Sequence, residues 1–76
     1  MNEETPARIR PYGKRELIDA YCGDILTPRA GERWFKDELR KYPGLMDTLN
    51  YLGYTPRQRI FTRAQVRAIF AAIGPP

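Results

Sequence analysis

The chain has 76 residues, with a formal net charge of +4, 42% hydrophobic residues and 29% charged residues. This length fits one small domain, and the composition is that of a globular chain whose thin core must use most of its apolar residues. No apolar run approaches the length of a membrane span, and the acidic first residues do not resemble a signal peptide. We therefore expect a cytoplasmic protein with no membrane partner, acting as a monomer or weak dimer.

Cysteine and histidine, which often act as catalytic residues or metal ligands, are scarce in this sequence. Cys22 is the only cysteine and histidine is absent, which excludes an intramolecular disulfide and a Cys/His metal site. We interpret Cys22 as a small, partly buried apolar residue, with a reactive thiol as the alternative. Without an imidazole, a glycine-rich phosphate loop or a plausible carboxylate pair, we expect neither an enzyme nor a bound cofactor or metal.

In chain order, we expect a flexible N-terminus over residues 1–7, a single helical domain over 8–74 and a tail at 75–76. The first segment of the domain, RIRPY at residues 8–12, alternates cationic and apolar side chains before a proline. The residue before a proline avoids the helical region, so this pattern predicts a short extended strand.

The next segment, YGKRELIDAYC, predicts a helix that turns Leu17, Ile18 and Tyr21 inward. The stretch CGDILT that follows has no helical period and is expected to be a loop. Because Ile25 and Leu26 are its apolar residues, we expect both to dip into the core.

A second helix is predicted over residues 27–41, with Thr27 as its N-cap and Pro28 at its first position. At about 100° per residue, the apolar side chains gather on one face: Gly31, Trp34, Phe35, Leu39 and Tyr42. Four cations fall within a sector of roughly 60° on the opposite face: Arg29, Arg33, Lys36 and Arg40. Nearby Glu32 and Asp37 could pair with these cations and leave an ordinary solvated surface.

A short third helix is predicted from Pro43 to Leu52, followed by a turn at Thr55-Pro56. The segment RQRIF at residues 57–61 carries cations at alternate positions, Arg57 and Arg59, before the apolar Ile60 and Phe61. We expect it to pair with residues 8–12 in a two-stranded ribbon that leans on the helices.

The last helix is predicted over residues 63–73. Thr62 and Gln65 have the spacing of a capping box, and Phe61 can pack on Val66 as a hydrophobic staple. The apolar face follows the helical period: Val66, Ile69, Phe70 and Ile73.

The positive charge is concentrated toward the end of the chain. Residues 1–26 sum to −1, residues 27–52 to +1 and residues 53–76 to +4. Charge of one sign suggests an anionic partner. Arg63 adds to this indication, because a cation in the first turn of a helix opposes the helix dipole by about 0.3–1 kcal/mol. A bound phosphate at that position would remove the conflict.

The segments IRPYGKRELIDAY, TPRAGERWFKDEL and RIFTRAQVRAI resemble the winged helix-turn-helix of MerR-like regulators and phage excisionases. Nearly the whole chain, from Arg8 to Pro76, is also similar to a family of short uncharacterised proteins of anaerobic gut bacteria. The first resemblance implies a mainly α, winged helix-turn-helix-like domain of about four helices with a two-stranded β ribbon. The chain departs from that pattern in its longer loop at residues 22–26 and in the helix inserted at residues 43–52.

The resemblance implies that the helix at residues 27–41 enters the major groove of duplex DNA and that a basic wing at residues 57–63 flanks it. We therefore predict a small DNA-binding accessory or regulatory protein of a mobile element. The predicted contacts are Arg29, Arg33, Lys36, Arg40, Arg57, Arg59, Arg63 and Arg67. The alternative is an adaptor domain with an acidic protein partner and no nucleic-acid role; the five tyrosines would suit such an interface.

Overall fold

The computed structural model describes residues 8–23 and 25–76, which form four helices and one two-stranded antiparallel sheet. The elements in chain order are β1 (Tyr12–Gly13), α1 (Lys14–Cys22), α2 (Pro28–Lys41), α3 (Pro43–Tyr51), β2 (Ile60–Phe61) and α4 (Arg63–Ile73). The prediction of a mainly α domain with four helices and a two-stranded ribbon is therefore confirmed. The flexible N-terminus expected over residues 1–7 lies outside the described residues.

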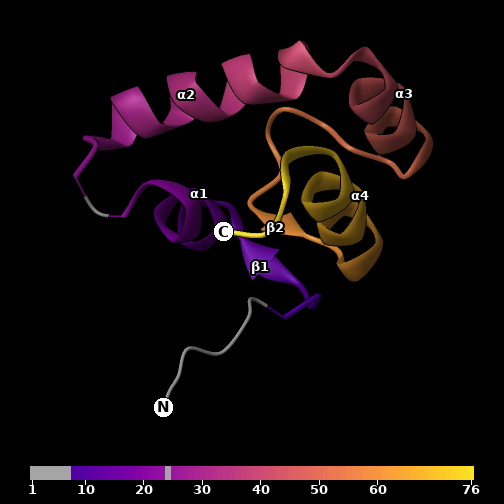
Figure 1. The fold of residues 1–76 in the computed structure, drawn as a ribbon, viewed down its shortest axis with the longest axis horizontal. Coiled ribbons are helices and arrows are strands. Elements are labelled where there is room, and N and C mark those ends of the chain that lie inside the picture. Colours follow the sequence, from indigo (N-terminus) through magenta and orange to yellow (C-terminus); the bar gives the residue numbers. More distant parts are fainter. Residues whose placement is uncertain (1–7, 24) are drawn as a thin grey trace.

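The helices pack in the order in which they follow one another (Figure 1). The long helix α2 runs along one side of the molecule, α1 packs against it, and α3 turns back beyond its end to pack on both α2 and α4. The helices form a closed circle, because α1 also contacts the end of α4: the Tyr21 hydroxyl of α1 donates a hydrogen bond to the Gly74 carbonyl, directly after α4. On the side away from α2, β1 pairs with β2.

Local capping explains where α2 and α4 begin. The Thr27 hydroxyl accepts the Ala30 N–H at 3.1 Å, and Pro28 takes the first position of α2, where no backbone donor is needed. At α4 the capping box is complete: the Thr62 hydroxyl accepts the Gln65 N–H at 3.2 Å, and the Gln65 side chain accepts the Thr62 N–H at 3.0 Å. Both predicted helix starts are confirmed.

Every helix and both strands contribute side chains to one core. The rings of Phe35 on α2 and Phe61 on β2 meet edge to face, with centroids 5.5 Å apart. Such pairs prefer this geometry because the ring edge is positive and the ring face negative. The buried apolar residues are Tyr12, Leu17, Ile18, Phe35, Leu39, Leu45, Leu49, Phe61, Val66, Ile69 and Phe70.

Two local expectations are wrong. The strands are two residues long, not five, because Pro11 has no N–H to donate to a ladder. Ile25 was expected in the core but is 83% exposed, whereas its neighbour Leu26 is half-buried. The Arg15 guanidinium donates to the Leu26 carbonyl at 3.2 Å, which holds the loop to α1 at Leu26 and leaves Ile25 facing solvent.

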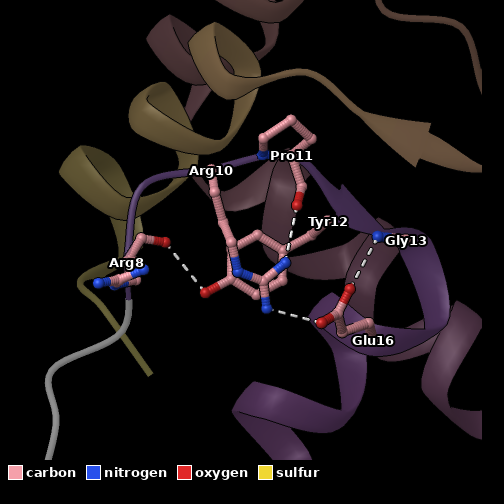
Figure 2. Close-up of polar contacts among 6 residues, drawn as sticks. All are labelled: Arg8, Arg10, Pro11, Tyr12, Gly13 and Glu16. Carbon is pink, nitrogen blue, oxygen red and sulfur yellow. Dashed lines mark hydrogen bonds and ion pairs between the residues drawn. The ribbon is translucent and has the colours of Figure 1, made fainter.

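The segment before β1 is held by side chains around Arg10 (Figure 2). The Arg10 guanidinium lies 3.8 Å from the centroid of the Tyr12 ring and donates to Glu16 Oε2 at 2.7 Å. Glu16 Oε1 in turn accepts the Gly13 N–H at 3.2 Å. These contacts, with the Tyr12 hydroxyl donating to the Arg8 carbonyl, fix the approach to α1 where the sequence predicted a longer strand.

Candidate nucleic-acid interface

The exposed side of α2 carries the predicted row of cations. The opposite side of the helix buries Gly31, Phe35 and Leu39 against the core, which turns the row toward solvent. All four cations are exposed and line one shallow hollow together with Glu32 and Asp37. They are Arg29, Arg33, Lys36 and Arg40.

The wing loop, residues 55–59, leads from α3 into β2. It turns where the Gln58 N–H donates to the Thr55 carbonyl at 3.2 Å, and it docks on the start of α1 through Lys14. The Lys14 N–H donates to the Arg59 carbonyl at 2.7 Å, and its ammonium donates to the Pro56 carbonyl at 3.3 Å. This leaves both arginine side chains of the loop exposed: Arg57 and Arg59.

A buried glutamine fixes the wing loop from the α4 side. Gln65 is 2% exposed, and its Nε2 donates to the Leu52 carbonyl at 3.2 Å. Its Oε1 accepts from Gln58 Nε2 at 2.7 Å as well as from the capped Thr62 N–H. The sequence revealed only the cap, because the partners Leu52 and Gln58 lie outside the helix and leave no periodic signal.

Glu32 joins the α2 row to the wing loop. It lines the hollow over the row, and it also lines a second hollow with the start of α1 and with Arg57 and Arg59. Its carboxylate is 2.8 Å from the Lys14 ammonium. The α2 row and the two loop arginines thus occupy one continuous surface, which we call the α2–wing surface: Arg29, Arg33, Lys36, Arg40, Arg57 and Arg59.

Ion pairing leaves this surface positive. Within residues 8–23 and 25–76, the ion pairs join Arg10 to Glu16, Lys14 to Glu32, Arg15 to Asp19 and Lys41 to Glu38. None of these pairs includes a predicted contact residue. The alternative in which Glu32 and Asp37 neutralise the α2 row has no support among these pairs: Glu32 pairs with Lys14 of α1, and Asp37 is in none of them.

The other two predicted contacts lie elsewhere. Arg63 and Arg67 are exposed on α4 and line a hollow with Thr48 of α3 and with Leu52, which directly follows α3. No member of the α2–wing surface is among the residues that line this hollow. The structure thus groups six of the eight predicted residues and separates two.

The remaining chemistry-bearing groups show no activated character. Burial raises the pKa of the Cys22 thiol, with smaller contributions from nearby carboxylates, so the thiolate is disfavoured. Burial also raises the pKa of Tyr21 to about 12. Across the described residues, no three metal-binding side chains cluster where they could hold an ion, and no helix is long and apolar enough to cross a membrane.

Comparison with known proteins gives one result at the level of the family. No curated protein and no solved structure matches the chain. A family model described as "Domain of unknown function (DUF4248)" matches residues 8–76, the stretch that contains every described helix and strand. This chain therefore belongs to the DUF4248 family.

Proposed function

We propose that the protein binds double-stranded DNA through the α2–wing surface. The observation that carries this proposal is the charge of that surface: six exposed cations line its two hollows, against the three carboxylates of Glu16, Glu32 and Asp37. Two of these carboxylates are already paired with other cations, Glu16 with Arg10 and Glu32 with Lys14. Lysine and arginine side chains placed in this way neutralise phosphates and release condensed counterions, which drives association with duplex DNA. An accessory or regulatory role in a mobile element would suit such a small binding domain.

The dimensions of α2 support docking in the major groove. From Arg29 to Arg40 the row of cations covers about 16 Å of helix at about 1.5 Å per residue, and a groove about 12 Å wide admits one α-helix. In the winged helix-turn-helix pattern, the start of this helix lies nearest the bases. Arg29 and Arg33 would then reach base edges, and the wing arginines would contact phosphates.

The test is a titration of a fluorescent random-sequence duplex between 50 and 200 mM salt. With Arg29 and Arg33 at base edges, four cations remain for phosphate contacts, and these predict that affinity falls about 10²-fold over this range. Lys36→Gln removes one cation of the surface and should lower the slope of log K against log salt by about 0.9. Lys41→Gln is the matched control, because it removes the same charge from the same helix at a residue already paired with Glu38.

Two outcomes would contradict the proposal. One is the absence of duplex binding at 50 mM salt. The other is an equal loss of affinity in Lys36→Gln and Lys41→Gln, which would mean that only net charge matters. If polyglutamate binds as tightly as duplex DNA and Arg33→Glu weakens both equally, the acidic-protein adaptor becomes the better description.

A further inference from the structure

A groove between α3 and α4 is lined mainly by small and apolar side chains. Hollows of about 740 and 440 Å³ adjoin each other there and share Thr48, Ala68 and Ala71, so they form one continuous depression. We call it the α3–α4 groove. Its walls are Gly44 and Thr48 on α3, Leu52 directly after α3, and Ala64, Ala68 and Ala71 on α4.

The groove lies beside the contact between α3 and α4. Both helices contribute buried side chains to the core, Leu45 and Leu49 from α3 and Ile69 from α4. On the flank of α4 beside this contact, alanines recur with helical spacing, and Ala64 and Ala71 are exposed. In the described part of the chain no segment covers them, so the helix flanks present apolar surface to solvent.

The rim of the groove carries side chains that favour a protein partner. Arg63 and Arg67 line the groove, and no acidic residue is among its described lining residues. Tyr51, three residues beyond Thr48 on α3 and thus its neighbour on the helix surface, is 89% exposed. Arginine and tyrosine are among the residues that contribute most to protein–protein binding.

We propose that the α3–α4 groove docks an acidic amphipathic helix of another protein. The apolar face of that helix would fill the space over the alanines, and its carboxylates would lie against Arg63 and Arg67. A helix fits better than a strand, because both walls are helices whose backbone groups are bonded internally and offer no sheet edge. A second copy of this chain fits less well, since it would bring a net charge of +4 and the same arginines to an already cationic rim.

The test uses a designed amphipathic peptide of about 16 residues, long enough to form a marginal helix, with leucine on one face and glutamate on the other. We expect it to bind ¹⁵N-labelled protein with amide shifts confined to α3 and α4. The same peptide with lysine in place of glutamate should not bind. Ala71→Glu should weaken binding at least tenfold, whereas Ala20→Glu, at an exposed alanine of α1, should leave it unchanged.

The arginines are tested by the double substitution Arg63→Gln with Arg67→Gln. This variant should bind the acidic peptide about three- to thirtyfold less tightly, as expected for the loss of two partly exposed charge pairs. The thermal midpoint of the protein should not change. The double substitution Arg29→Gln with Arg33→Gln should lower the affinity for duplex DNA and leave the affinity for the peptide unchanged. Because peptide affinity and DNA affinity are measured separately, the docking proposal can fail while DNA binding holds, and DNA binding can fail while docking holds.

Several results would overturn the docking proposal. The acidic peptide could cause no shifts at millimolar concentration, or shifts centred on α2. Sedimentation could show a dimer that Ala71→Glu dissociates, which would make a second copy the occupant. Finally, the double variant of Arg63 and Arg67 could lower the affinity for duplex DNA and leave the affinity for the peptide unchanged. That result would mean that these arginines bind nucleic acid.

Discussion

At the scale of single residues, Gln65 connects three successive segments: the end of α3, the wing loop and the start of α4. Its amide caps α4 at Thr62, bonds to the end of α3 at the Leu52 carbonyl and meets Gln58 of the wing loop. A buried polar group is stabilising only when its hydrogen bonds are satisfied, and both ends of this amide have partners. The position of Arg57 and Arg59 therefore depends on a side chain that never reaches the surface.

Gln65→Leu should lower the free energy of unfolding by about 1–3 kcal/mol, because it removes the side-chain partner of the Leu52 carbonyl and of the Thr62 N–H. The Gln58 amide would lose one partner but keep its bonds to Thr55 and Ile60. Urea unfolding followed by circular dichroism measures this loss. Asn50→Leu, at an exposed position of α3, should change stability by less than about 0.5 kcal/mol. Equal stability of the Gln65→Leu variant and the unsubstituted protein would show that the amide network is dispensable.

At the scale of elements, the contact between α1 and α2 depends on Gly31. A Cβ atom at this position would lie 3.0 Å from Ile18 Cγ2 and 3.2 Å from an Arg15 guanidinium nitrogen. Ile18 is fully buried and cannot readily move away. The glycine thus permits the close approach of the two helices, at some cost in the helical propensity of α2.

Gly31→Ala should therefore destabilise the protein by up to about 2 kcal/mol, since overpacking costs about 1–3 kcal/mol and the better helix propensity of alanine returns about 1 kcal/mol. Gly44→Ala is the matched control, because a Cβ atom there meets nothing within 4 Å, and it should not lower stability. Thermal unfolding of both variants measures the difference. A more stable Gly31→Ala protein would contradict the close approach described for α1 and α2.

At the scale of the whole molecule, the contacts of Glu16 affect stability toward acid. The hydrogen bond from Arg10, and then the Gly13 N–H, hold the pKa of Glu16 below its usual value. A lowered pKa in the folded state gives stabilisation that is complete above the unfolded pKa of about 4.3 and is lost as the pH falls through the folded pKa.

The thermal midpoint of Glu16→Gln should accordingly lie below that of the unsubstituted protein at pH 6, and the gap should narrow as the pH falls below about 4. Asp47→Asn removes one exposed carboxylate from α3 as a control and should show no such convergence. A gap that stays constant down to pH 3 would mean that the Arg10–Glu16 contact contributes nothing to folding.

The sequence predicted those features of the whole fold that depend on neighbouring residues. Caps at Thr27 and Thr62 and the apolar periods act within one or two turns, so all four helices and the exposed row on α2 could be inferred. The pairing of Glu32 with Lys14 and the bonds of Gln65 to Leu52 and Gln58 join different elements, and no local spacing encodes them. The separation of Arg63 and Arg67 from the α2–wing surface likewise depends on how α4 is oriented by packing.

The closed circle of elements also bears on how the chain reaches this structure. Contacts of α1 with α2, α2 with α3 and α3 with α4 join consecutive helices, whereas β1 and β2 lie near opposite ends of the described chain. Local contacts form with little loss of chain entropy, and distant ones require a long loop to close first. We therefore expect the helical pairs to form early and the pairing of Tyr12 with Phe61 to form late in folding.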